Sequence, residues 1–131
     1  MITKTASRQF MLMGTIFAGI AVAAGAFGAH SLRGMLDAPM LAAFETAARY
    51  QMYHALGLCI VGLAIEQHPE GRYTTVGWFF TIGILLFAGS LYSVSLTGVR
   101  WLGALTPLGG VAFITGWALF AWEVWKSTNR S

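Results

Sequence analysis

The stretch that decides the fold runs from Tyr73 to Val99 and reads YTTVGWFFTIGILLFAGSLYSVSLTGV, without a single charged side chain. An α-helix of about 20 apolar residues crosses the ~30 Å hydrocarbon core of a bilayer. Three companion runs are similarly apolar: Phe10–Ala29, Tyr50–Ile65 and Trp101–Trp122. The Tyr50 run reaches the required length if its helix extends back towards Pro39. We therefore expect an all-α integral membrane protein.

The composition agrees with this expectation. Hydrophobic residues make up 56% and charged residues 10% of the 131 residues, whereas an ordinary soluble domain has about 25% charged residues. The net charge of +3 comes from cations scattered along the chain. They form no basic stripe interleaved with aromatics, so we expect no nucleic acid as a partner. The single cysteine, Cys59, excludes a disulfide within the chain and a cysteine-based metal motif.

We expect one domain, residues 1–131, folded as an antiparallel bundle of four transmembrane helices. The predicted spans are about 9–29, 39–65, 73–96 and 101–125. Asp37 is the predicted N-cap of the second span, with Pro39 in its first turn. Lys4 and Arg8 before an apolar run resemble a secretory signal peptide. The run is longer than the usual apolar core of about 7–15 residues, so we expect a retained first span.

The distribution of cations predicts the orientation. With four spans, both termini and the middle connector lie on the same side of the membrane. That side carries Lys4, Arg8, Arg72, Lys126 and Arg130, and the other side carries Arg33, Arg49 and Arg100. Because lysine and arginine accumulate on the cytoplasmic side, we expect both termini in the cytoplasm.

Small residues predict close packing in the first span. Their spacing of four and three places them on one stripe: Gly14, Ala18, Ala21, Gly25 and Gly28. Such stripes let helix backbones approach closely within a membrane. We expect Gly25 and Gly28 to face another helix. In the fourth span, Pro107 predicts a kink, because it cannot donate a backbone hydrogen bond.

Polar residues gather in the outer half of the predicted spans, away from the termini. Glu45 and Arg49 are spaced i, i+4, and a rise of about 1.5 Å per residue puts His54 near the midplane. Ionisable groups inside a membrane usually face the bundle interior, so we expect a polar pocket open to the outer face and sealed by the apolar inner halves. Its predicted ligand-binding residues are His30, Glu45, Arg49, Tyr50, Tyr53, His54, Ser90, Ser93 and Thr106.

The same residues allow plainer interpretations. Glu45 and Arg49 form either a helix-surface ion pair near the headgroups or a buried pair lining the pocket. His54 is a hydrogen-bonded core residue, a proton-relay or ligand-binding group, or a metal or haem ligand. His30 and His54 differ by about 14 Å in depth, which is too far for one metal ion to bridge. No metal-binding or phosphate-binding motif occurs, so we expect no metal site and no cofactor.

Four ordered motifs carry a resemblance to a known family. They are Gly25–His30 (GAFGAH), Thr46–Leu56 (TAARYQMYHAL), Phe87–Tyr92 (FAGSLY), and Thr106–Gly110 (TPLGG) followed by Gly116–Trp117. Together they resemble the small bacterial membrane proteins of the YgdD/YwdK type, the domain of unknown function 423, over essentially the whole chain. The resemblance implies a multi-pass protein of the bacterial cytoplasmic (inner) membrane. It implies no particular activity.

The leading functional hypothesis is a non-enzymatic bundle, without catalytic residues, that binds a lipid or a membrane protein partner. One alternative is a small oligomeric proton-coupled transporter or channel that uses Glu45, Arg49, His54 and His30 as a relay. A second alternative is an accessory redox or respiratory subunit, which would need a cofactor that no motif indicates. A chain of 131 residues leaves little room for an alternating-access machine in one copy. The sequence leaves open whether the chain forms a homo-oligomer.

Overall fold

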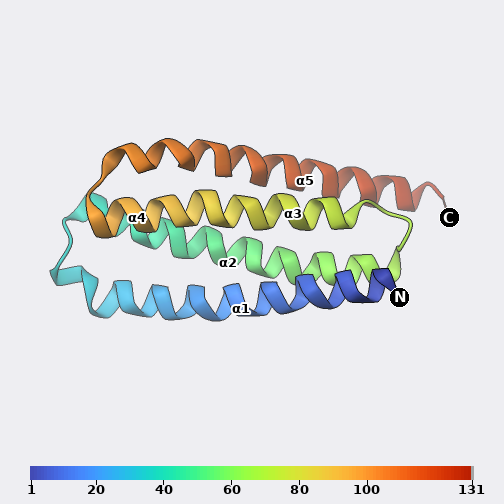
Figure 1. Cartoon of the computed structure of the whole chain (residues 1–131), viewed down its shortest axis with the longest axis horizontal. Helices are drawn as coiled ribbons and strands as arrows, with labels where there is room; N and C mark the ends of the chain where they lie inside the picture. Colours follow the sequence, from blue (N-terminus) through green and yellow to red (C-terminus); the bar gives the residue numbers. More distant parts are fainter. Residues whose placement is uncertain (131) are drawn as a thin grey trace.

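The computed structural model describes residues 1–130, which fold entirely into helices and short connections. The elements are α1 (Ile2–His30), η1 (Leu32–Gly34), α2 (Ala38–Gln67), α3 (Tyr73–Gly83), η2 (Ile84–Ala88), α4 (Gly89–Thr97), η3 (Arg100–Leu105) and α5 (Thr106–Thr128). The η2 segment is one π-helical turn between α3 and α4, and η3 is a 3₁₀-helix that leads into α5. Four helical rods result, and the expectation of an all-α chain is confirmed (Figure 1).

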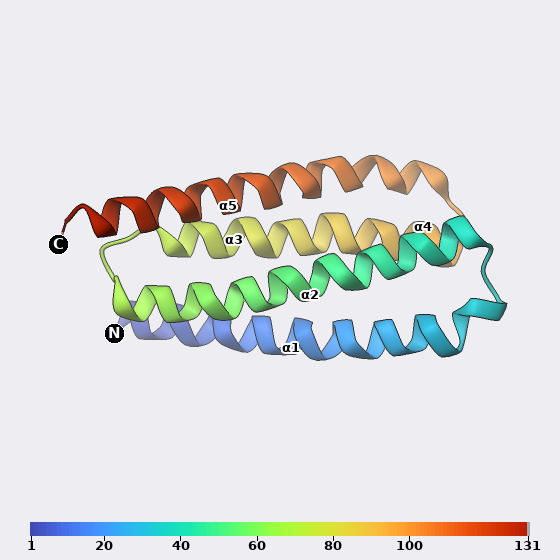
Figure 2. The same ribbon diagram turned by 180° about the vertical axis from the view of Figure 1, so that it is seen from behind.

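The four rods run antiparallel in chain order, side by side (Figures 1 and 2). The N-terminus, the α2–α3 turn and the C-terminus lie at one end of the molecule, which we call the terminal end. The α1–α2 and α4–α5 connections lie at the opposite end, which we call the connector end. Helix α2 is central, because it packs along α1 on one side and against α3, η2 and α4 on another, while α5 packs mainly on α3 and η2.

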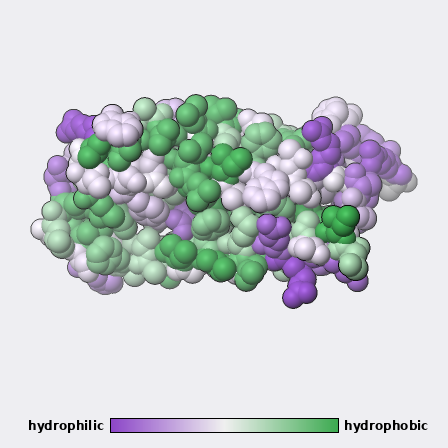
Figure 3. Space-filling view, viewed as in Figure 1, coloured by the Kyte–Doolittle hydropathy of each residue, from purple (hydrophilic) through white to green (hydrophobic). Residues whose placement is uncertain are grey.

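Length and apolarity qualify three of the rods as membrane spans. They are Ile2–His30, Tyr73–Thr97 and Arg100–Thr128. Helix α2 has 30 residues but is not among them, because its first and middle turns carry the polar residues Glu45, Arg49, Gln51 and His54. On the face shown in Figure 3, hydrophobic residues predominate over the middle and hydrophilic residues gather mainly towards both ends.

The start of α2 follows the expected rules of helix capping. The Asp37 carboxylate accepts a hydrogen bond from the backbone N–H of Met40 at 2.9 Å, and proline occupies the first turn. The predicted cap is confirmed. Pro107, where a kink was predicted, lies in the first turn of α5, directly after the 3₁₀-helix η3, so it interrupts no α-helical hydrogen bond of α5. A missing N–H costs nothing at that position.

Glycine allows α1 to approach α2 closely. A Cβ atom at Gly14 would lie 2.6 Å from the carbonyl oxygen of Ala55, and one at Gly28 would lie 3.0 Å from the ring of Phe44. The expected contact is therefore confirmed for Gly28. It is wrong for Gly25, whose Cβ position has no neighbour within 4 Å. The buried small residues of α1 repeat every seven positions, Ser7, Gly14, Ala21 and Gly28, and Gly25 lies off this line.

Large apolar side chains fill the space between the rods from the middle towards the terminal end. Phe10, Leu58, Val61, Val76 and Phe80 are at most 1% exposed, and they come from α1, α2 and α3. Interiors of this kind pack about as densely as organic crystals, so the half of the bundle near the termini is closed.

This packing predicts opposite effects for two glycine substitutions on α1. Gly14→Ala should lower the free energy of unfolding in detergent by about 1–3 kcal/mol, because the new methyl group meets backbone of α2. Gly25→Ala should leave it unchanged or raise it by up to about 1 kcal/mol, because alanine is the better helix former and nothing obstructs it. Thermal melts of the two purified variants test this, and equal melting temperatures would contradict the α1–α2 packing.

Candidate functional site

The row of residues expected to line the pocket faces away from the bundle. Arg49 and Tyr53 are exposed, Tyr53 to 52%, and Glu45 is half-buried. Among residues 1–130 the ion pairs are His68–Glu70 and Glu123–Lys126, so Glu45 and Arg49 do not pair. The expected inward-facing pair is wrong. An arginine near the end of a span can extend to the headgroups, which avoids the cost of burial without an interior partner.

The inward face of α2 instead presents Gln51. Its side chain is 3% exposed and donates from Nε2 to the carbonyl oxygen of Phe17 in α1 at 2.8 Å. Its Oε1 accepts from the hydroxyl of Tyr92 in α4 at 2.9 Å. The ring of Tyr92 packs edge-on against Phe44, with centroids 5.0 Å apart. One amide therefore links three rods.

His54 lies one turn further along the same face and is also buried. Its Nδ1 is 2.8 Å from the carbonyl oxygen of Tyr50, which can only accept, so Nδ1 carries a proton. Its Nε2 is 2.9 Å from the indole N–H of Trp117 and accepts that hydrogen bond. The imidazole is thus neutral with both nitrogens satisfied, and it stacks on Phe113 with centroids 3.5 Å apart. Of the roles considered for His54, this geometry matches the hydrogen-bonded core residue.

The remaining predicted site residues divide into two groups. Ser90 and Thr106 meet, as expected, with their hydroxyl oxygens 2.5 Å apart between α4 and α5. Ser93 bonds back to the carbonyl of Gly89 in its own helix. Tyr50 is half-exposed, and its ring packs on Phe87 at 4.9 Å. His30 is exposed at the end of α1 and does not join the others. The structure therefore does not gather the nine residues into one pocket.

A lateral groove lies next to the Gln51–Tyr92 pair. It has a volume of about 180 Å³ and runs between α1 on one side and η2 and α4 on the other. Its lining is mostly apolar: Phe17, Ile20, Gln51, Ile84, Leu85, Ala88, Gly89 and Tyr92. Ile20 and Leu85 are 51% and 60% exposed, so the groove opens sideways and not towards the end of the bundle.

A second buried polar group lies at the terminal end. Glu123 of α5 is 3% exposed; its Oε2 accepts from the backbone N–H of Arg72 at 3.1 Å, and its Oε1 is 2.8 Å from Nζ of Lys126. This carboxylate fastens α5 to the turn between α2 and α3. With the Arg72 N–H and the Lys126 ammonium group as its donors, this buried carboxylate holds two segments of the chain together.

Sequence reasoning missed Gln51, Tyr92, Trp117 and Glu123. Two signals were available for them. Gln51 lies three or four residues from the small residues Ala47, Ala48 and Ala55, so all four share one face of the helix. A face of small residues is one that packs against another helix. Glu123 is three residues before Lys126, at the spacing of a helical ion pair.

The hydrogen bond between Gln51 and Tyr92 can be tested by a double-mutant cycle. Tyr92→Phe should cost about 0.5–1.5 kcal/mol of unfolding free energy, because the buried Oε1 of Gln51 loses its donor. In a Gln51→Leu background the same substitution should cost close to nothing. Tyr50→Phe is the matched control, because its hydroxyl makes no hydrogen bond within residues 1–130. An equal cost of Tyr92→Phe in both backgrounds would argue against the link.

Comparison with known proteins identifies the family. The model of the family described as "Protein of unknown function (DUF423)" matches residues 24–110. The UPF0382 membrane protein YwdK of Bacillus subtilis is 50% identical over 86% of this chain and 92% of its own length. A UPF0382 membrane protein of Staphylococcus saprophyticus is 44% identical over 91% of this chain and 98% of its own. No solved structure matches. The chain therefore belongs to the DUF423 family and, like these relatives, is a membrane protein.

Proposed function

We propose that the protein is a non-enzymatic, four-spanning protein of the bacterial cytoplasmic membrane that binds a lipid chain in the groove between α1 and α4. A fourth span through α2 is supported by its 30 residues and by its place between the three apolar rods. The polar side chains Gln51 and His54 lower its apolarity, but both are buried and hydrogen-bonded within the bundle. Hydrogen bonds of this kind make polar residues acceptable at membrane depth.

The charges support an orientation with both termini in the cytoplasm. The terminal end carries five of the eight lysine and arginine residues, namely Lys4, Arg8, Arg72, Lys126 and Arg130. Of the other three, Arg33 and Arg100 lie at the connector end, and Arg49 lies inside α2, in the half nearer that end. Lysine and arginine near the ends of spans accumulate on the cytoplasmic side.

Cysteine labelling tests this topology. In a Cys59→Ala background, Gly34→Cys at the connector end should react with a membrane-impermeant maleimide in intact cells, because Gly34 is exposed. Ile2→Cys at the terminal end should react only after lysis. Labelling of Ile2→Cys in intact cells would overturn the orientation. Labelling of both cysteines from the same side would show that α1 does not cross the membrane, which would overturn the four-span arrangement.

A binding role fits the polar groups better than catalysis or transport. The hydroxyl, amide, imidazole and indole groups that lie between the rods are paired with one another: Ser90 with Thr106, Gln51 with Tyr92, and His54 with Trp117. A proton relay needs polar groups in sequence from one side of the membrane to the other. Here the half near the termini is packed with Leu58, Val61, Val76 and Phe80 instead.

The groove is the observation that carries the proposal. Six of its eight lining residues are apolar, and its two polar residues already hydrogen-bond each other. The wall therefore offers hydrocarbon with no free donor or acceptor to satisfy. It opens sideways, where the acyl chains of bilayer lipids lie, so an acyl chain is the occupant whose chemistry matches.

A leucine placed in the groove should exclude this lipid. The Cβ position of Gly89 has no neighbour within 4 Å, so Gly89→Leu can project into the groove without a backbone clash. We expect native mass spectrometry of the detergent-purified variant, incubated with dioleoylphosphatidylethanolamine, to show at least a five-fold fall in retained lipid.

Gly19→Leu provides the matched control for this experiment. Gly19 is exposed on α1, and its Cβ position is equally open, but it does not line the groove. It should therefore retain lipid as the unsubstituted protein does. Equal retention by both variants would refute binding in the groove.

A further inference from the structure

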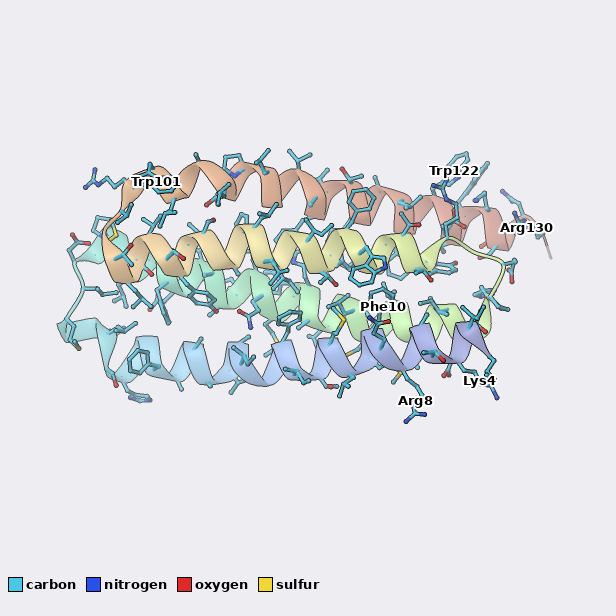
Figure 4. All side chains as sticks on the ribbon, viewed as in Figure 1. Lys4, Arg8, Phe10, Trp101, Trp122 and Arg130 are labelled. Atoms are coloured by element: carbon cyan, nitrogen blue, oxygen red, sulfur yellow. The ribbon has the colours of Figure 1, made fainter. Side chains whose placement is uncertain are left out.

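The outward face of α1 near the terminal end presents two cations one helical turn apart. Lys4 and Arg8 are exposed and share a surface hollow with the polar side chains of Thr5 and Gln9 and with Leu12. In Figure 4 both cations project from α1 away from the other rods, while Phe10 of the same helix points inward. Residues spaced i, i+4 on a helix have Cβ atoms about 5–6 Å apart, so one anionic group can contact both.

Within residues 1–130 no carboxylate lies at ion-pair distance from either cation. The first turn of α1 has no acidic residue. Within residues 1–130 neither Lys4 nor Arg8 forms an ion pair, whereas Lys126 at the same end is paired with Glu123. Arginine binds phosphate through two parallel hydrogen bonds, and lysine adds a point charge beside it. The two side chains together therefore favour a phosphate group with net negative charge.

The surface of α1 changes from charged to apolar within one helical turn after Arg8, towards the middle of the molecule. Leu12 and Ile16 are 61% and 52% exposed and continue along α1 towards the middle of the molecule. The hydroxyl of Thr15, which lies between them, bonds to the carbonyl oxygens of Met11 and Leu12 in its own helix. That hydroxyl is occupied, so the strip below the cations offers mainly hydrocarbon to its surroundings.

From these observations we propose that Lys4 and Arg8 form a binding site for the headgroup of an anionic phospholipid in the membrane leaflet at the terminal end. The phosphate lies between the ammonium and guanidinium groups, and the acyl chains run down over Leu12 and Ile16. A zwitterionic lipid is disfavoured, because its own ammonium group is repelled by the two uncompensated cations. The site is separate from the groove, which is lined by Phe17, Ile20 and residues of α2, η2 and α4.

The test is a lipid titration of the full chain in detergent, followed by native mass spectrometry. Dioleoylphosphatidylglycerol and dioleoylphosphatidylcholine are the probes. The titration is made in the Gly89→Leu background, in which the groove no longer contributes, and there the protein should retain the anionic lipid at least ten-fold more strongly than the zwitterionic one. In the same background the double variant K4Q/R8Q should lose at least ten-fold of the affinity for the anionic lipid. The control R72Q/R130Q removes the same charge from the same end on other elements and should change it less than two-fold.

Three outcomes would overturn the proposal. Equal losses in the two double variants would mean diffuse attraction to the charge of the terminal end. Equal retention of the two lipids would mean that the cations do not select charge. Displacement of the lipid by millimolar inorganic phosphate would identify the free ion as the ligand. Gly89→Leu should leave retention of the anionic lipid at Lys4 and Arg8 intact, so a failure of groove binding is distinguishable from a failure of this site.

Discussion

The arrangement depends on two polar side chains of α2 that must find hydrogen-bond partners inside an apolar bundle. A polar group left unpaired in hydrocarbon costs several kcal/mol. Gln51 meets this requirement through the backbone of α1 and the hydroxyl of Tyr92 in α4, and His54 meets it through Trp117 in α5. Each bond joins α2 to a different rod. A shift of any rod by one turn, about 5.4 Å, would break a bond, so the two residues fix the relative height of all four.

Close packing at the level of these bonds relies on glycine. Gly14 brings α1 onto the backbone of α2, and Gly57 and Gly116 make room for the ring of Phe80. Gly109 meets the main chain of Phe87, which lies within the π-helical turn η2. The wider π-turn places Phe87 against α5 and Ser90 against Thr106. Steric fit and hydrogen bonding thus specify the same register, a consistency expected of a sequence with one folded state.

The helices were predictable from sequence, and the inward faces only in part, because His54 and Ser90 point inward as expected whereas Arg49 does not. Apolar runs, the Asp37 cap and the polar connectors indicate four helices, and the structure has four rods near those positions. The inward face of α2 was assigned from the charges of Glu45 and Arg49, on the argument that charge avoids lipid. Long side chains near a span end can reach the headgroups instead, and a shorter amide such as Gln51 cannot. The better guide to the buried face of α2 was therefore Gln51, a short polar residue that shares a helix face with alanines.

Pairing of the buried polar groups also constrains how the protein can act. A ligand that entered between the rods would have to break bonds such as His54 to Trp117 and displace rings stacked at 3.5 Å. Breaking a buried hydrogen bond without replacing it costs about 1–3 kcal/mol, and opening a packed aromatic core costs more. The outer surfaces impose no such cost, since Tyr53, Leu85 and Trp101 are already more than half exposed. Recognition by this protein should therefore take place on the lateral faces and ends of the bundle, with the interior serving as a rigid support.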